Sequence, residues 1–368
     1  MYLSYILNSK KIALGAIFAL FFAFVTSEVS AQDSANAVPE MVVKEVNPEH
    51  AEEKFDPAVT ILEHIGDAHS WHLWGHTSLH LPVILYTPAG IEIFCSGEFL
   101  NEHHESRDYT GKYHTYRNVA EHIKIVGTDG NIDEAASAQI IDLSITKNVA
   151  AMLISVAVIL LIFISVAGTY KKRANKAPKG LQSWVEPIVI FVRDDIAKPN
   201  IGYKYERFMP YLLTVFFFIW VNNLMGLIPI FPGSANVTGN IAVTFVLSVI
   251  VLIIVNINGN KYYWGHIFKP DVPWWLLPIM WVVEITSVLS KPFALMIRLF
   301  ANITAGHIIV LSLISLIFIF KTLAMAPVSI AFVLFMDILE LLVGFLQAFI
   351  FTMLTALFIG TAIEEHHH

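Results

Sequence analysis

Two long apolar segments near the C-terminus, Trp274–Phe320 and Val328–Ile363, constrain the fold of this chain more than any other feature. They hold 47 and 36 residues, so continuous helices would measure ~70 and ~54 Å at ~1.5 Å per residue. The hydrocarbon core of a bilayer is only ~30 Å thick. Each segment must therefore break into two spans or lie strongly tilted. The candidate turns, Ser290–Pro292 and Gly344, are weak, so we predict two steeply tilted antiparallel helices joined by an outer turn around residues 321–327.

The composition places these segments in a membrane. Hydrophobic residues make up 56% of the 368 residues and charged residues 14%, whereas a soluble domain carries about 25% charged residues. The net charge of −7 arises from acidic residues that concentrate before position 150, and it argues against nucleic acid as a partner. The single cysteine, Cys95, excludes an intrachain disulfide framework.

Three shorter apolar stretches complete the expected membrane domain, residues 148–368. They predict membrane helices over 148–170, 208–231 and 240–257. Residues 181–196 have the pattern of an amphipathic helix that lies along the cytoplasmic face. We therefore expect an all-α polytopic membrane protein with about five membrane helices, of which 274–320 and 328–363 are the last two.

The N-terminus is typical of an export signal, residues 1–31. A basic patch and an apolar core, Ile12–Val25, are followed by small residues before Gln32; an uncleaved anchor is the alternative. The basic run Lys171–Arg173 closes the first predicted span, and the positive-inside rule places it in the cytoplasm. We expect a protein of the bacterial inner (plasma) membrane with residues 32–147 in the periplasm and the C-terminus in the cytoplasm.

Residues 32–147 are polar and rich in histidine. The ten histidines are His50, His64, His69, His72, His76, His80, His103, His104, His114 and His122. Two short strands are predicted within Leu81–Phe94 and another at Ile123–Val126, so we expect a small α+β or β region. Four of the histidines follow one another at steps of three and four residues: His69, His72, His76 and His80. On a helix this spacing would place their imidazoles near one face, where they could bind a metal. No paired thiol accompanies them, and interfacial packing of an amphipathic helix is the preferred interpretation.

Arg298 is a charged residue deep inside the first long segment. An arginine at bilayer depth costs ~2.5–3.5 kcal/mol on insertion scales, so we expect it to face a partner or a wet cavity. Glu284 and Lys291 precede it at intervals of seven residues and share its helical stripe, and Asn302 lies one turn further on. This stripe is our candidate functional site; the alternative is that Arg298 reaches an interface.

One register of the predicted antiparallel pair brings four polar residues level. In an antiparallel pair of helices, residues at equal depth have numbers whose sum is nearly constant. The sum is 645 for Arg298 with Gln347 and 647 for His307 with Glu340. We expect the first pair near mid-depth and the second nearer the external turn. There an acid and an imidazole can pass a proton through water. A structural hydrogen-bonded pair is the alternative.

The same segments resemble the a subunit of rotary F-type ATP synthases. Met296–Gly306 is similar to the family signature, Leu346–Thr355 to its final helix and Asn222–Pro229 to its second span. The similarity runs from about Asn148 to Glu365. It implies that the family's essential arginine corresponds to Arg298.

The resemblance also implies further proton-translocation residues. With Arg298, the set is Glu284, Asn302, His307, Glu340 and Gln347. Relative to some bacterial members, the acid and the imidazole of the external channel are exchanged at His307 and Glu340. Phe358 stands at a late tyrosine position of the family, so no role of that hydroxyl carries over.

The implied function is proton-driven rotation through two offset half-channels. Protons neutralise carboxylates on a rotating c-subunit ring, and Arg298 lowers the pKa of each arriving carboxylate and blocks a direct leak. The resemblance also implies the b-subunit stator stalk and the nucleotide-binding sector as partners. Membrane lipid is a further expected partner. The chain has no Gly-x-x-x-x-Gly-Lys-Ser/Thr phosphate loop, so we expect no enzyme activity of its own and no cofactor, with the proton as the default coupling ion.

Two other functions stay open on the residues alone. One is a secondary ion-coupled transporter with an intramembrane Arg/Glu/His site, although no internal repeat is visible between the halves. The other is a periplasmic metal-capturing module on a membrane anchor, which the ten histidines would serve.

Overall fold

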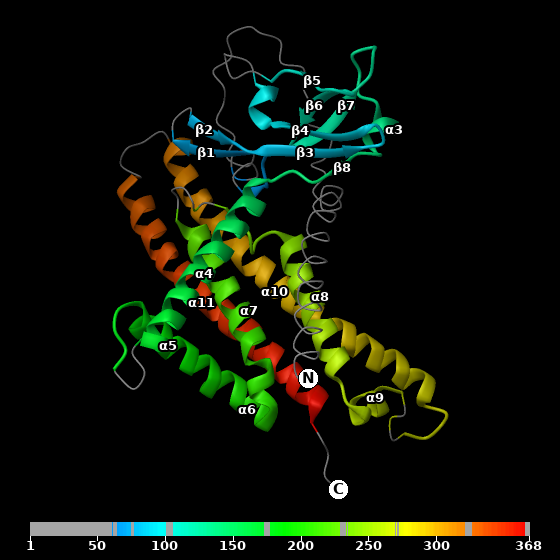
Figure 1. Ribbon diagram of the computed structural model, residues 1–368, viewed down its shortest axis with the longest axis vertical. Coiled ribbons are helices and arrows are strands. Elements are labelled where there is room, and N and C mark those ends of the chain that lie inside the picture. The colour runs from blue at the N-terminus through cyan, green and yellow to red at the C-terminus, as the bar shows by residue number, and fades with distance from the viewer. Residues whose placement is uncertain are drawn as a thin grey trace. The chain divides into compact units, whose positions relative to one another are not determined.

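Figure 1 shows the computed structural model of the chain, which describes residues 61, 65–74, 77–100, 106–172, 177–228, 233, 235–268, 270, 272–320 and 326–364. The chain divides into two compact units, Met1–Ala150 and Ala151–His368. Several predicted features lie outside the described residues: the export signal, positions 321–325 of the outer turn, the C-terminal histidines, and His50, His64, His76, His103 and His104.

The N-terminal unit is built from short antiparallel strands. A hairpin pairs β1 (Ser70–Trp74) with β2 (Thr77–His80). A three-stranded sheet has the order β4 (Gly90–Cys95), β3 (Pro82–Thr87) and β8 (Ile141–Asp142). A second one has the order β5 (Tyr109–Thr110), β6 (Thr115–Val119) and β7 (His122–Val126). The described part of the unit also contains two one-turn helices, η1 (Ser96–Phe99) and α3 (Glu134–Ser137).

The core of this unit follows from the alternation of side chains along its strands. Val83 and Leu85 of β3 are fully buried, and Phe94 of β4 and Tyr116 of β6 pack against them. The strands expected within Leu81–Phe94 and at Ile123–Val126 are therefore confirmed. The strands of residues 70–142 thus form small antiparallel sheets, with the short helix α3 beside β7.

The helical reading of the histidine-rich stretch is wrong. His72 lies in β1 and His80 ends β2, so the backbone is extended where a helix was expected. Successive side chains of a strand point to opposite faces, so a spacing of three and four residues does not place side chains on one common face as it does on a helix. Among the described residues, no group of three or more metal-ligating side chains is found. Trp71 is buried in the unit rather than placed at an interface.

The second unit is helical, and the first of its helices, α4 (Lys147–Lys172), begins in the N-terminal unit. The other elements are α5 (Leu181–Phe191), the π-helical η2 (Val192–Ala197), α6 (Lys198–Ile201), η3 (Gly202–Lys204), α7 (Tyr205–Leu227), α8 (Ile241–Asn258), α9 (Lys261–Phe268), α10 (Leu277–Phe320) and α11 (Ala326–Ile363). Among the described residues, five helical stretches are long and apolar enough to cross a membrane: Lys147–Lys172, Leu181–Leu227, Ile241–Asn258, Leu277–Phe320 and Ala326–Ile363. The protein is thus a multi-pass membrane protein.

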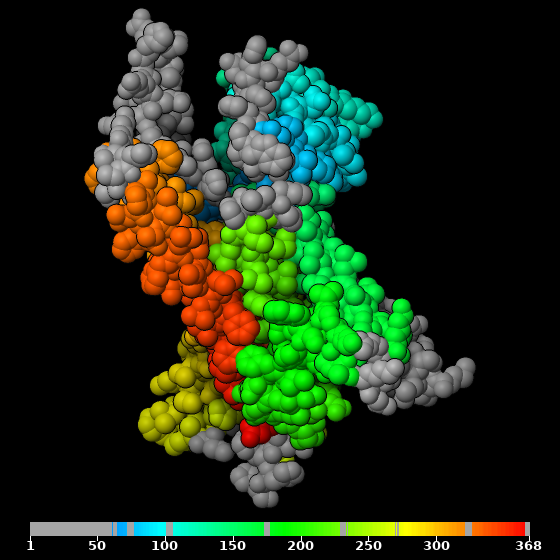
Figure 2. All heavy atoms as spheres, turned by 90° about the vertical axis from the view of Figure 1, so that its left-hand side faces the viewer, coloured from blue at the N-terminus to red at the C-terminus, as the bar shows by residue number. Residues whose placement is uncertain are grey.

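The two longest helices are continuous. α10 has 44 residues and passes through Pro292 without interruption, and α11 has 38 residues and passes through Gly344. α11 packs along α7 and α10, and α10 packs along α8 (Figure 1). Figure 2 shows α11, coloured orange to red, along one face of the unit. Its first half exposes large apolar side chains such as Phe332 and Phe335, while its second half is buried against neighbouring helices.

Proline residues explain where two helices begin and end. α10 begins at Leu277 rather than Trp274, because Pro273 is followed by a turn. α7 ends at Leu227 rather than residue 231, and Ile228 is extended with φ −80° and ψ 115°. The residue before a proline disfavours the helical conformation, and Pro229 follows Ile228.

Candidate functional site

Arg298 lies on the outer side of α10. Its neighbours Leu295 and Leu299 are buried, whereas Arg298 and Asn302, one turn later, are exposed. Within the described residues, the Arg298 guanidinium has no hydrogen bond or ion pair. The guanidinium therefore projects from a strongly apolar helix with its charge uncompensated by the described part of the chain.

His307 and Glu340 meet between α10 and α11, as the register predicts. The Nδ1 atom of His307 lies 2.5 Å from Oε1 of Glu340, and the two side chains are 17% and 6% exposed. Gly306 makes this approach feasible, because a Cβ atom there would lie 2.7 Å from the same carboxylate oxygen. An acid and an imidazole thus share a hydrogen bond in a largely water-excluded place.

The polar residues of α11 lie on its buried side. Glu340, Gly344 and Gln347 are all buried and follow one another at steps of four and three residues. Gln347 is 4% exposed. The described residues show no hydrogen bond between Gln347 and Arg298, so the two share the predicted register without a direct contact.

A set of buried polar residues that the sequence analysis missed lies between α7, α8 and α11. Asn223 of α7 donates from Nδ2 to the backbone oxygen of Gly344 at 2.9 Å, and its Oδ1 accepts from the Thr238 hydroxyl at 2.6 Å. The Asn236 side chain accepts from Gly239 N at 2.9 Å, and Thr304 of α10 donates to the oxygen of Gly239. Two adjacent asparagines inside an apolar span, Asn222 and Asn223, are the signal that points to this polar set.

Two atoms of this polar set lack a protein partner. The Oδ1 atom of Asn222 and the Nδ2 atom of Asn236 are buried without a hydrogen bond in the part of the chain that the structure describes. Buried amide groups are rarely left unpaired, and ordered water commonly satisfies them. His307 borders the same region, since its Nε2 atom would lie 3.8 Å from a Cβ atom at Gly226 of α7. Buried polar atoms without a protein partner in the described chain therefore lie in the polar set that His307 borders.

Glu284 and Lys291 occupy the other end of the α10 stripe. The Glu284 side chain is 18% exposed, and its Oε1 atom lies 3.5 Å from Nδ1 of His266 on α9. Two turns later, the Lys291 ammonium lies 5.6 Å from the centre of the Phe358 ring. This arrangement is a cation–π contact between α10 and α11.

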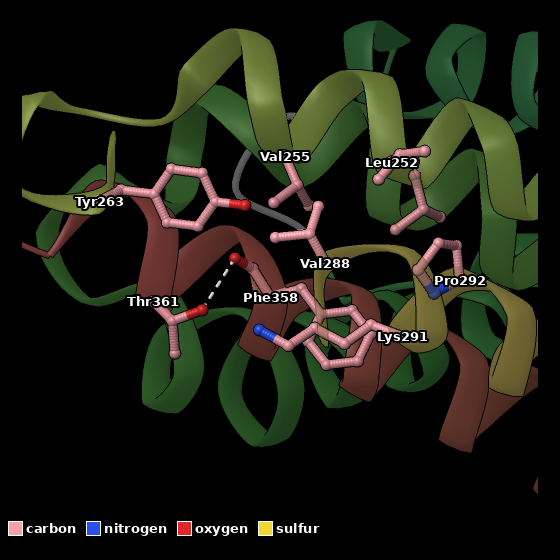
Figure 3. Close-up of a pocket in the computed structure, with 9 residues that line it drawn as sticks. Leu252, Val255, Tyr263, Val288, Lys291, Pro292, Phe358 and Thr361 are labelled. Atoms are coloured by element: carbon pink, nitrogen blue, oxygen red, sulfur yellow. Dashed lines mark hydrogen bonds between the residues drawn. The ribbon is translucent and has the colours of Figure 1, made fainter. Parts of the chain in front are cut away.

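A small cavity adjoins Lys291 (Figure 3). Its volume is about 20 Å³, and Tyr263 of α9 and Thr361 of α11 line it together with Lys291 and Phe358. A cavity of this size holds about one water molecule. The Lys291 side chain lies alongside the Phe358 ring, and the Thr361 hydroxyl donates to the Phe358 backbone oxygen at 3.0 Å. The other lining residues are apolar, so Lys291, Tyr263 and Thr361 bring the polar atoms to this cavity between α8, α9, α10 and α11.

The N-terminal unit holds a different histidine site. His69 is 5% exposed, with Nδ1 3.0 Å from Oε2 of Glu121 and Nε2 3.5 Å from Oδ2 of Asp142. Burial lowers the pKa of His69, but the two carboxylates outweigh burial and raise this pKa to about 9. The imidazolium is therefore the stable form of His69 near neutral pH.

The chain conformation around His69 fits a structural role. Ala120 and Glu121 have φ angles of 51° and 66° in the turn between β6 and β7, as a type I′ turn requires. The Glu121 carboxylate accepts a hydrogen bond from the His69 backbone at 2.7 Å as well as contacting the ring. Next to His69, Asp67 accepts from Asn148 N and the Thr146 hydroxyl, and so caps the first turn of α4.

Comparison with known proteins agrees with the geometry of the helical unit. The family model described as ATP synthase A chain matches residues 149–360, and a domain of unknown function (DUF8433) matches residues 60–143. The ATP synthase subunit a of Chloroherpeton thalassium is 49% identical over 232 residues, which cover 62% of this chain and 69% of the relative.

Two further relatives give the same picture. ATP synthase subunit a 2 of Chlorobaculum tepidum is 51% identical over 236 residues, covering 61% of this chain and 66% of the relative. ATP synthase subunit a of Chlorobium phaeobacteroides is 49% identical over 234 residues, covering 62% and 68%. The chain thus spans about two thirds of the length of these relatives. These matches do not favour the secondary-transporter alternative, and the chain belongs to the ATP synthase A chain family, the proton-translocating, non-catalytic stator subunits of the membrane sector.

Proposed function

We propose that protons reach and leave a rotating c-subunit ring through two offset half-channels of this chain, with Arg298 between them. The observation that carries the proposal is the exposed Arg298 guanidinium, which lacks an ionic partner in the described part of the chain. A fixed positive charge on an apolar surface favours the ionised form of a carboxylate that arrives beside it. The arriving site then loses its proton, and the same charge opposes a direct proton leak between the half-channels.

The His307–Glu340 pair is proposed to serve the external half-channel. An imidazole and a carboxylate 2.5 Å apart can exchange a proton directly. The buried polar set around Asn222 and Asn236 supplies sites where water connects the pair to the outside. Glu284, on the opposite end of the α10 stripe, is proposed to serve the cytoplasmic half-channel.

Asn302 and Gln347 are proposed to assist Arg298. Asn302 is exposed one turn beyond Arg298 on the same side of α10, so it lies where a ring carboxylate would arrive. Gln347 is buried on α11 at the level of Arg298 in the predicted register. Both amides can accept a guanidinium hydrogen bond while no ring carboxylate is present.

The lengths of α10 and α11 support a steeply tilted antiparallel hairpin in the membrane. Continuous helices of 44 and 38 residues measure ~66 and ~57 Å, about twice the ~30 Å hydrocarbon core. The basic end of α4, Lys171 and Lys172, supports a cytoplasmic location of that end. We place the chain in the bacterial inner membrane, with residues 32–147 in the periplasm, after a signal at 1–31, and with the C-terminus in the cytoplasm.

The family sets the chain within the F-type ATP synthase complex. We propose the c-subunit ring as the partner of the Arg298 face, and the b-subunit stator stalk and the nucleotide-binding sector as the other partners in the complex. The exposed apolar side chains of α11, including Phe332 and Phe335, provide surface for lipid or for the ring. The proton is the proposed coupling ion.

The test is Arg298→Ala in the assembled complex in sealed vesicles. We expect proton-coupled ATP synthesis to be abolished while the subunit remains in the complex, because only the fixed charge is removed. Arg193→Ala is a matched control, since Arg193 pairs with Asp194 on the same unit. Normal synthesis by the Arg298→Ala complex would refute the proposed function.

A further inference from the structure

The α9 helix brings a histidine to Glu284 from outside the α10–α11 pair. The His266 side chain is 71% exposed, while the Glu284 side chain is 18% exposed. Nδ1 of His266 lies 3.5 Å from Glu284, at the outer limit of a hydrogen bond. Since the ring is largely exposed while its Nδ1 atom contacts Glu284, His266 connects a shielded carboxylate with the surface of the chain.

Contacts on both sides of His266 hold α9 in place. The Tyr263 hydroxyl donates to Oδ1 of Asn256 on α8 at 3.2 Å. On the other side, Nε1 of Trp281 on α10 donates to the backbone oxygen of Phe268 at 2.9 Å. Asn260, just before α9, donates to the backbone oxygen of Glu364 at 2.9 Å. α9 is therefore tied to α8, to α10 and to the end of α11.

We infer that His266 is a proton-relay residue at the mouth of the half-channel that begins at Glu284. This inference rests on the proposed function. A proton on Glu284 passes to Nδ1 of His266 while the proton on Nε2 leaves to water, and the reverse sequence delivers a proton inward. Imidazole suits this task because it gains and loses a proton between pH 5 and 8 and has two distinct nitrogens. In this step the Nδ1–H bond forms and the Nε2–H bond breaks; before the next proton, the ring returns to its Nε2–H form by losing the Nδ1 proton to water and gaining one at Nε2 from water, so the proton count is conserved.

The titratable and polar groups that face His266 come from α8, α9, α10 and the end of α11. Glu284 faces it from α10, and Lys291 lies two turns further along the same helix. Lys261 and Tyr263 are the other titratable groups of α9 near it, besides Tyr262. α8 contributes the neutral amides Asn256 and Asn258, and Glu364 follows α11. Among these described groups, Glu284 is the one whose side chain reaches the His266 ring, at 3.5 Å.

The experiment measures passive proton flow through the full membrane sector in vesicles, with His266→Gln, at low and at high buffer concentration. At low buffer concentration we expect the flow to fall by about threefold to tenfold, because water alone must then accept protons from Glu284. Added imidazole should restore the flow, since a mobile acceptor replaces the missing ring. Lys261→Gln is the matched control, because it removes a nearby charge without removing the relay, and it should leave the flow unchanged.

Three results would overturn the inference: unchanged flow in His266→Gln at low buffer concentration, a loss that imidazole does not restore, or an equal loss in Lys261→Gln. Because the His266 side chain is 71% exposed, we expect the variant to assemble. His266→Asn provides a second variant if the first assembles poorly. Failure here leaves the role of Arg298 intact, whereas normal synthesis by Arg298→Ala would remove the proposed function itself.

Discussion

Both units of the chain contain a histidine in contact with carboxylates, yet the surroundings of the two pairs differ. His69 in the N-terminal unit has a carboxylate at each ring nitrogen and lies in a turn-and-strand framework. His307 in the helical unit has a carboxylate at Nδ1 only, from Glu340, and unpaired buried amide atoms lie in the adjoining polar set. The difference lies in the carboxylates: Glu121 and Asp142 lie at the two ring nitrogens of His69, whereas among the described residues His307 has its ion pair with Glu340 at Nδ1 and its Nε2 atom borders the polar set.

This comparison teaches that a histidine–carboxylate contact alone does not identify a transport site. At His69 the two carboxylates stabilise the charged imidazolium and hold it in one state. At His307 the ion pair with Glu340 involves Nδ1, and Nε2 lies toward Gly226 of α7 and the polar set. The following predictions test whether this distinction holds.

The largest effect is expected from the His307–Glu340 pair. His307→Ala and Glu340→Gln should each lower proton-driven ATP synthesis by at least about tenfold, because each removes one partner of a proton exchange. The exchanged double variant, His307→Glu with Glu340→His, should retain more activity than the variants His307→Glu and Glu340→His made singly. ATP synthesis per assembled complex is the measurement. A double variant no better than the worse single one would show that the two residues are not a functional unit.

His69→Gln should act on stability and not on transport. Removing the imidazolium leaves Glu121 and Asp142 without their buried partner, which costs about 3 kcal/mol in comparable pairs. Hydrogen-exchange protection of β1, β2 and β8 in the full chain should fall accordingly. The rate of proton transport per assembled complex should stay unchanged; a transport defect of the size seen for His307→Ala would contradict the comparison.

A dependence on pH should follow from the same site. The pKa of His69 is about 9 in the folded chain and 6.5 in a model peptide, so the stability it contributes is complete below about pH 6.5 and is lost as the pH rises through about 9. Hydrogen-exchange protection of the N-terminal unit, corrected for intrinsic exchange, should fall over this range. His69→Gln should show a much smaller fall.

Gly306→Ala should give the smallest of these effects. The added Cβ atom would lie 2.7 Å from Glu340, so the carboxylate must shift away from its present position against His307. We expect proton-driven ATP synthesis to fall by about twofold to fivefold. Gly168→Ala on α4 is the control, because no atom lies within 4 Å of a Cβ there. Equal effects of the two substitutions would show that Gly306 has no particular role in positioning Glu340 against His307.

Regular helices made much of the helical unit predictable. The 3.6-residue period and the approximately constant residue sum of antiparallel helices placed His307 opposite Glu340, and the structure confirms this contact. The contact between Asn223 and Gly344 could not be predicted from the sequence, because their hydrogen bond joins residues 121 positions apart and depends on how α7 packs on α11. The α10–α11 pairing is therefore visible in the sequence, while the polar set beside it is not.

The N-terminal unit was less predictable for a related reason. The hairpin of β1 and β2 depends on pairing such as Trp71 with Leu79, and the histidine spacing alone is equally compatible with a helix. The partner of His69, Glu121, stands 52 residues away on a different turn. Short strands at Leu81–Phe94 were predictable because β-branched residues alternate around a turn.

The buried amide atoms of Asn222 and Asn236 have a consequence for how the helical unit behaves in different solvents. Within the described chain these two atoms have no hydrogen-bond partner, and buried amides of this kind are commonly satisfied by ordered water. Under the proposed function, heavy water would then enter the proposed proton path itself and not only the medium around it. Proton flow and the local stability of α7 should accordingly respond together to deuteration.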